Sequence, residues 1–174
     1  MSAGPYSERV MRLLVERKGE ARAALYLSFK RERSPRLLGP LFRYLRARGA
    51  RGLSVLEVGC SFGHNTEYLC EQPEVAEIHA FDTDPAFVEI ARIKAEELGL
   101  KQVADVARFS NAETRRLPYA DAAFDLVLVV GVIEHLPARG RREIVDEYYR
   151  VLRPGGHIAI LDTPNRLFPL ETHS

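Results

Sequence analysis

The stretch from Leu53 to Thr66 constrains this chain most, because it combines a short apolar run with a glycine-rich turn. The run 53–58 has the length of a strand that is buried on both faces of a parallel sheet. The chain then turns through residues 59–63, and Asn65 or Thr66 is placed to cap a following helix. Glycine permits a positive φ in such a turn and leaves space for a ligand. The ligand would also meet unpaired backbone N–H groups at the helix N-terminus.

The spacing of the glycines argues against a phosphate-binding loop. A dinucleotide fingerprint needs G-x-G-x-x-G, whereas here Ser61 lies between Gly59 and Gly63, and His64 takes the place of the third glycine. A P-loop ends in Gly-Lys-Ser/Thr, and residues 53–66 contain no lysine. The turn therefore favours a nucleoside cofactor that needs no phosphate contact. A tight structural turn without a ligand is the alternative.

Strand and helix patterns alternate along the rest of the chain. Apolar runs predict further strands at 78–81, 103–109, 126–130 and 157–161. Asp84-Pro85 predicts the start of a helix that Gly99 ends, and another helix is predicted over about 139–152, before Pro154-Gly155-Gly156. This alternation predicts an α/β fold with a doubly wound parallel sheet of strand order 3-2-1-4-5. Ligands bind at the carboxyl ends of the strands in such sheets.

The first 50 residues precede this alternation and predict a helical arm, which leaves residues 51–174 as the core. Apolar residues at helical spacing indicate one helix from Tyr6 to Phe29, with Gly19 as a weak point, and Ser34-Pro35 predicts the start of a second. Residues 1–54 carry 13 Lys or Arg against four Asp or Glu, whereas the remainder carries 12 against 20. Such an arm could attract an anionic substrate, a lipid headgroup or nucleic acid, but a solvated amphipathic arm is the simpler interpretation.

Composition excludes several classes of protein. No apolar run approaches the ~20 residues of a membrane span, and the N-terminus has no signal-peptide pattern, so we expect a cytoplasmic protein. The two cysteines, Cys60 and Cys70, predict neither a disulfide framework nor a metal site.

An acidic residue at the end of the second predicted strand points to a ribose. Asp82 follows Glu57 by 25 residues. In a doubly wound sheet, a carboxylate at this place accepts hydrogen bonds from both ribose hydroxyls. The alternative is that Asp82 only begins a turn and Asp84 caps the next helix.

Several segments together resemble one family. LEVGCSFG resembles the first motif of the class I S-adenosylmethionine-dependent methyltransferases, an acidic residue followed by G-x-G-x-G, with Ser61 as the departure. HAFDTDPAFVEIAR, NAE with the following LPYADAAFDLV, EHLP and YRVLRPGG resemble, in order, later segments of its small-molecule (type 11-like) members. The resemblance covers about residues 53–166 and leaves out the arm.

The resemblance implies a Rossmann-like fold, S-adenosylmethionine as the donor, and in-line transfer of its methyl group to a small-molecule or lipid-like acceptor. Asn111 stands where the family usually has Asp, and its side-chain oxygen can still accept from the adenine amine. His135 is the candidate general base, although it could instead pack the loop. His64 is left out of the site. The cofactor-binding residues that we expect are Glu57, Gly59, Cys60, Ser61, Gly63, Asp82, Thr83, Asn111, Ala112 and Gly131.

The family's sixth and seventh strands have no counterpart in the sequence, so we expect a C-terminally truncated core. The fifth strand would then lie at the edge of the sheet, where its unpaired backbone groups favour self-association. Two other functions stay open. One is an NAD(P)-dependent oxidoreductase, which the loop spacing disfavours, and the other is a non-catalytic module whose basic arm binds nucleic acid, a partner that we consider the less expected.

Overall fold

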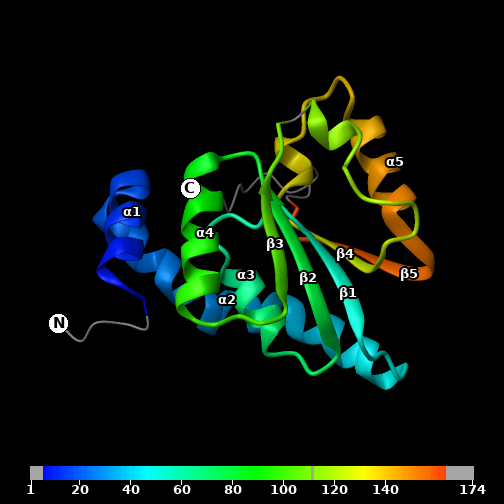
Figure 1. Cartoon of the computed structure of the whole chain (residues 1–174), viewed down its shortest axis with the longest axis horizontal. Helices are drawn as coiled ribbons and strands as arrows, with labels where there is room; N and C mark the ends of the chain where they lie inside the picture. The colour runs from blue at the N-terminus through cyan, green and yellow to red at the C-terminus, as the bar shows by residue number, and fades with distance from the viewer. Residues whose placement is uncertain (1–5, 111, 164–174) are drawn as a thin grey trace, which may run out of the picture.

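A five-stranded parallel sheet forms the centre of the protein. The computed structural model describes residues 6–110 and 112–163 of the 174. The strands are β1 (Leu53–Val58), β2 (Val75–Asp82), β3 (Val103–Arg108), β4 (Phe124–Val130) and β5 (Leu152–Leu161), in the order β3-β2-β1-β4-β5 (Figure 1). All neighbouring pairs are parallel. The doubly wound sheet and its predicted strand order are confirmed.

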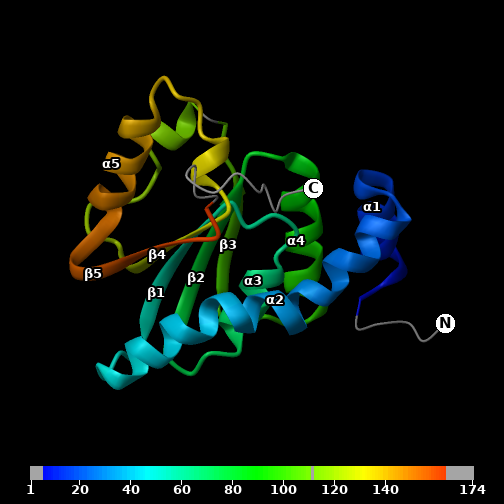
Figure 2. The same cartoon turned by 180° about the vertical axis from the view of Figure 1, so that it is seen from behind.

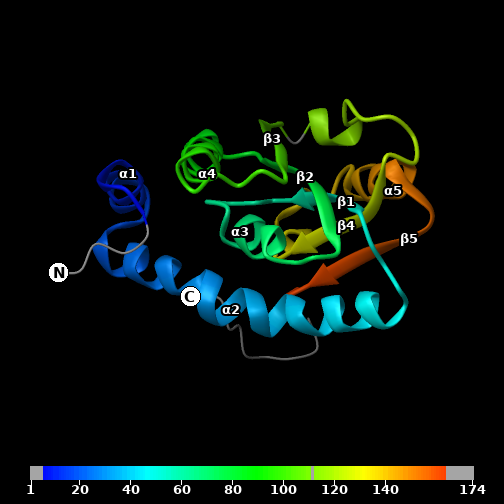
Figure 3. The ribbon, with the colours of Figure 1, turned by 60° about the horizontal axis from the view of Figure 1, so that its bottom comes forward.

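Helices cover both faces of this sheet. Helices α2 (Glu20–Ala47), α3 (His64–Cys70) and α4 (Pro85–Glu97) lie on one face, and α5 (Arg141–Val151) lies on the other (Figure 3). Two short 3-10 helices, η1 (Glu113–Arg115) and η2 (Ile133–His135), follow β3 and β4. Helix α4 begins as predicted, because the Asp84 carboxylate caps it by accepting from the backbone N–H of Ala86 at 2.9 Å. None of the helices that the structure describes is long and apolar enough to cross a membrane.

The arm divides at a different place from the one predicted. Helix α1 (Glu8–Lys18) ends at Gly19, whose φ is +77°, and α2 then continues through Pro35 and Pro40 for 28 residues (Figure 2). The prediction that a second helix begins at Ser34-Pro35 is wrong. Each proline removes one backbone donor, but the apolar face of α2 packs on the sheet and holds the helix together. The buried residues of that face are Leu38, Phe42 and Leu45.

Other boundaries shift by a few residues. Strand β2 begins at Val75 rather than at Ile78, and β4 begins at Phe124 rather than at Leu126. Strand β5 begins at Leu152, and its pairing with β4 is irregular around the predicted turn at 154–156. Helix α3 has Gly63 as its N-cap, in the left-handed conformation, so the prediction of Asn65 or Thr66 as the cap is wrong.

Candidate functional site

A cavity of about 930 Å³ opens at the carboxyl ends of the strands. Its wall is formed by the loop after β1, the ends of β2 and β4, the residue after β5 and one face of α2. Six of the predicted site residues line it: Gly59, Ser61, Asp82, Thr83, Gly131 and His135. Ligand sites of doubly wound sheets lie at this edge, so the cavity is the candidate site.

The glycine-rich loop passes close to the segment after β4. Gly59 has a φ of +71°, and a Cβ at this position would lie 2.4 Å from Cγ2 of Val132. Ser61 has a φ of +51°, although it is not glycine. This left-handed conformation explains why the related motif has glycine where this chain has Ser61. The departure in sequence therefore keeps the backbone conformation of the loop.

The backbone N–H groups of this loop are largely used within the protein. Those of Gly59 and Cys60 both donate to the Phe81 carbonyl at 2.9 Å, and that of Ser61 donates to the Asp82 carboxylate at 2.8 Å. The N–H of Gly63 donates to the carbonyl of Cys60. These four N–H groups are therefore used within the protein, and three of them hold the loop to the end of β2. The expectation of unpaired N–H groups concerned the first turn of α3, which follows this loop.

Asp82 is fixed at the end of β2 by two of its neighbours. Its Oδ2 accepts from the backbone N–H of Ser61 at 2.8 Å, and its Oδ1 accepts from that of Asp84 at 2.9 Å. The two bonds fix the orientation of the carboxylate at the cavity wall. Each carboxylate oxygen has a second lone pair, so both can still accept from a ligand hydroxyl.

Four other predicted residues do not line the cavity. Glu57 is buried behind the loop, where its Oε2 accepts from the Thr66 hydroxyl at 2.6 Å. Burial raises the pKa of Glu57 to about 8, and the nearby Asp82 charge adds to the rise.

The thiol of Cys60 is fully buried, and burial raises its pKa. Gly63 packs against α4, and Ala112 precedes η1 away from the wall. Asn111 lies outside the described residues.

The segment after β4 contributes a glycine with a positive φ and an imidazole to the site. Gly131 has a φ of +61°, and a Cβ there would be in ordinary van der Waals contact with Glu134 at 3.8 Å and with Arg33 and Asp162 at 3.9 Å. His135 lies in η2, and its side chain is exposed where it lines the cavity.

His64, also on the wall, is buried, and its ring stacks on that of Phe62 at a centroid distance of 4.8 Å. Burial, with the charges of Arg33 and Lys94, lowers the pKa of His64 to about 3, so it is neutral near pH 7.

Helix α2 supplies a wall that the sequence reasoning did not assign to the site. One ion pair joins it to the sheet, because the Arg33 guanidinium contacts the Asp162 carboxylate just after β5. A second ion pair joins α1 to the core, between Arg17 and Asp84. The helical spacing of the arm's arginines was the available signal, but it does not reveal which partner they face. The cavity residues of α2 are Arg22, Leu25, Tyr26, Arg33 and Arg36.

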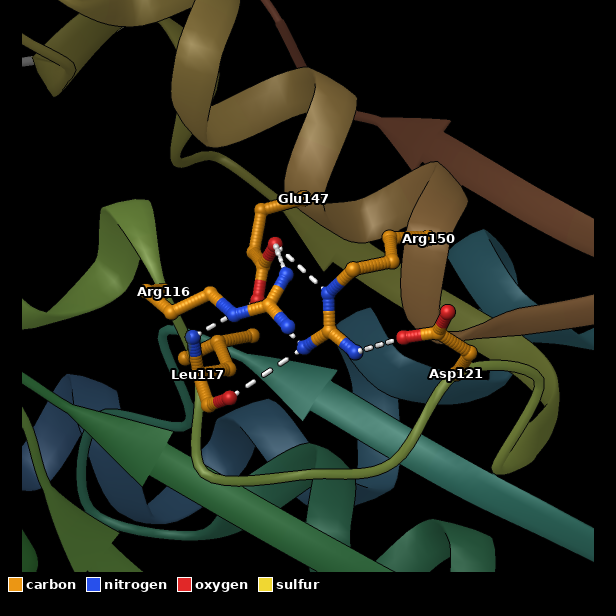
Figure 4. A network of polar contacts seen from close by, with 5 residues as sticks. All are labelled: Arg116, Leu117, Asp121, Glu147 and Arg150. Atoms are coloured by element: carbon orange, nitrogen blue, oxygen red, sulfur yellow. Dashed lines mark hydrogen bonds and ion pairs between the residues drawn. The ribbon is translucent and has the colours of Figure 1, made fainter.

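A polar network holds the chain between β3 and β4 against α5 (Figure 4). The backbone N–H of Leu117 donates to Glu147 Oε1 at 2.7 Å, and Arg150 donates both to the Leu117 carbonyl and to Asp121. Arg116 lies within 3.7 Å of the same Glu147 carboxylate. These bonds hold the segment that follows η1 against α5.

Comparison with known proteins agrees with this geometry. A family model described as a methyltransferase domain matches residues 55–156, which is more than half of the chain. Methyltransferase GfsG of Streptomyces halstedii is 34% identical over 119 residues, which are 68% of this chain and 41% of that protein. The chain thus spans less than half of this curated relative.

Solved structures show the same relationship. A SAM-dependent methyltransferase from Aquifex aeolicus is 25% identical, with a TM-score of 0.59 over 73% of this chain and 67% of that one. The [4+2]-cyclase SpnF is 26% identical, with a TM-score of 0.59 over 70% of this chain and 43% of that one. The family match, the strand order and the position of the cavity together show that the chain belongs to the class I S-adenosylmethionine-dependent methyltransferases.

Proposed function

We propose that this chain binds S-adenosylmethionine in the cavity and transfers the methyl group to a small-molecule or lipid-like acceptor. The observation that carries the proposal is Asp82, a carboxylate oriented by two backbone N–H groups where the glycine loop meets the end of β2. Such a group suits the two hydroxyls of a ribose. Its surroundings suit a nucleoside donor rather than a dinucleotide, because the fingerprint for a pyrophosphate is absent from the loop.

The residues present fit this donor. Gly59 and Gly131 present backbone without a side chain to the cavity, and Asp82 and Thr83 suit the ribose. For the adenine side we propose Asn111, which lies outside the described residues, with its neighbour Ala112, which does not itself line the cavity. When bound, the donor supplies a methyl group made electrophilic by its sulfonium sulfur. The chain then has to hold the acceptor in line and exclude water, which is positioning rather than covalent catalysis. Glu57, Cys60 and Gly63 would support the loop from behind.

His135 is the proposed general base. Its imidazole is exposed on the cavity wall beyond Gly131, where an acceptor would lie. A neutral imidazole can take the proton that an acceptor loses as it is methylated. An acceptor that is already a strong nucleophile would not need this step.

Two further proposals concern self-association and the location of the protein in the cell. Strand β5 pairs only with β4 among the described strands, and Ile160 on it is 44% exposed. An unpaired edge of this kind favours association with a second copy through β5. We also propose a cytoplasmic location.

The donor site is tested by calorimetric titration with S-adenosylhomocysteine, the demethylated donor. We expect Asp82→Ala to weaken this binding by about 1.5–3 kcal/mol, the scale of hydrogen bonds to a charged group. Asp105→Ala is the matched control, since Asp105 is an exposed carboxylate on β3 that does not line the cavity.

Unchanged affinity in a folded Asp82→Ala variant would remove the ribose assignment. Binding of NAD(P) in place of S-adenosylhomocysteine would favour an oxidoreductase. Binding of neither, together with salt-sensitive binding of DNA or RNA, would favour a non-catalytic module. Because the similar protein SpnF is a cyclase, a labelled-donor assay for methyl transfer is the necessary second measurement.

A further inference from the structure

One face of helix α2 forms a wall, or roof, of the cavity and carries several arginines. The cavity residues of α2 fall at positions 22, 25, 26, 33 and 36, a spacing that keeps them on one side of a helix. Three of the five are arginine. The spacing therefore places three guanidinium groups over a site whose proposed donor itself carries a positively charged sulfur.

Four carboxylates line the cavity, and none of them is paired with Arg22 or Arg36. Asp84 pairs with Arg17 of α1, Asp162 pairs with Arg33, Asp82 accepts from two backbone N–H groups, and Glu134 lies near Arg33 at the surface of Gly131. Within residues 6–110 and 112–163, neither Arg22 nor Arg36 has a hydrogen-bond or ion-pair partner. Two guanidinium groups on the cavity wall are thus left to water or to a ligand.

The two arginines lie far apart along α2. They are 14 residues apart, which at 1.5 Å per residue is about 21 Å along the helix, too far for one small anion to bridge. Arg22 lies one turn before Tyr26, whose ring contacts Phe62 of the glycine loop at a centroid distance of 4.8 Å. Arg22 therefore belongs to the donor end.

Arg36 belongs to the other end. It follows Arg33 by one helical turn. Arg33 contacts Asp162 after β5, lies 3.9 Å from the position of a Cβ on Gly131, and has its Nη1 3.4 Å from Nε2 of His64, directly after the glycine loop. This is the part of the wall that also carries His135. An acceptor between the donor and His135 would lie beside Arg36.

We propose that the methyl acceptor carries a carboxylate or a phosphate, and that Arg36 binds this group. The proposal rests on the proposed methyl transfer and adds the class of acceptor. A guanidinium presents paired N–H donors that match the oxygens of either anion, and it keeps its charge at all relevant pH values. Arg33 stands beside it and adds positive charge, while its contact with Asp162 holds α2 at this distance from the sheet.

The test uses the whole chain saturated with S-adenosylhomocysteine and titrated with two probes, inorganic phosphate and acetate, with acetamide as the neutral comparison. We expect saturable binding of at least one anion and no binding of acetamide. Arg36→Gln should lower the affinity for the anion tenfold or more, and Arg36→Lys should lower this affinity less. Arg43→Gln is the matched control, because Arg43 is an exposed arginine of α2 away from the cavity. Affinity for S-adenosylhomocysteine should be the same in all four proteins.

The results separate the two proposals. Absence of saturable anion binding, or equal binding by wild type and Arg36→Gln, would overturn the role of Arg36. Loss of anion binding in Arg22→Gln, with binding retained in Arg36→Gln, would place the anion near Arg22 and would also overturn the role of Arg36. Failure of wild type to bind S-adenosylhomocysteine would overturn the proposed function alone, because the same anion titrations of the unliganded chain still decide for or against Arg36. Preference for phosphate or for acetate identifies the anionic group.

Discussion

At the scale of the residue, Glu57 makes the stability of the fold depend on pH. Its carboxyl is buried and holds a proton up to about pH 8 in the folded chain, against an ordinary pKa of 4.5. A raised pKa in the folded state gives stability that is complete below pH 4.5 and is lost as pH rises toward 8. Thr66 and Lys94 oppose the rise, and Asp82 supports it.

We therefore expect Glu57→Gln to flatten the fall in unfolding free energy between pH 4.5 and 8, by a few kcal/mol at most. Urea denaturation of wild type and variant across this range measures the difference. The two curves should diverge in the variant's favour as pH rises. Parallel curves would show that Glu57 ionises normally in the folded chain.

The sequence predicted the strand-end residues better than the arm residues, for a physical reason. Gly59, Ser61 and Asp82 follow directly from the strands that carry them, and parallel strands bring their carboxyl ends to one edge. Arg33 and Arg36 reach the same cavity from a helix far away in the chain. Their place depends on how α2 packs, and local spacing does not encode that.

At the scale of the element, α2 shows tertiary packing overriding local signals. Ser34 before Pro35 is a strong helix-start pattern, yet Ser34 is fully buried and its hydroxyl donates to Asn65 Oδ1 of α3 at 2.7 Å. The same side chain that would cap a helix end instead joins two helices. Gly19, which has only a weak signal, is the real boundary.

Ser34→Ala should lower the free energy of unfolding by about 1–3 kcal/mol, because it leaves the buried Asn65 oxygen without this donor. Ser28→Ala is the control, since the Ser28 hydroxyl bonds only its own helix at an exposed place. Chemical denaturation measures both. Equal losses in the two variants would contradict the role given to the Ser34–Asn65 bond.

At the scale of the whole molecule, one buried cluster joins the arm, the glycine loop and α4. The Lys94 side chain is 1% exposed, pairs with Glu67 and donates to the Phe62 carbonyl at 2.9 Å. The Tyr6 hydroxyl donates to the same Glu67 carboxylate. Three segments distant in the chain thus meet at one ammonium group.

Removing one partner from this buried pair should be costly. We expect Lys94→Met to destabilise the protein by about 3–5 kcal/mol, because it leaves Glu67 buried without its countercharge. Replacing both residues, as Lys94→Met with Glu67→Leu, should recover part of the loss. Lys101→Met, at an exposed lysine, is the control in the same denaturation experiment. A Lys94→Met variant as stable as wild type would exclude this role.

The position of α2 has a consequence for how ligands act on the fold. Its C-terminal part belongs to the core through Leu38, Phe42 and Leu45, while one face of its residues 22–36 forms the roof of the cavity. A bound molecule would touch both the roof and the strand ends, so its binding energy would add to the energy that keeps the arm attached. Binding of a ligand in the cavity should therefore be detectable far from the cavity, as slower hydrogen exchange of α1 and as greater resistance of the arm to proteases.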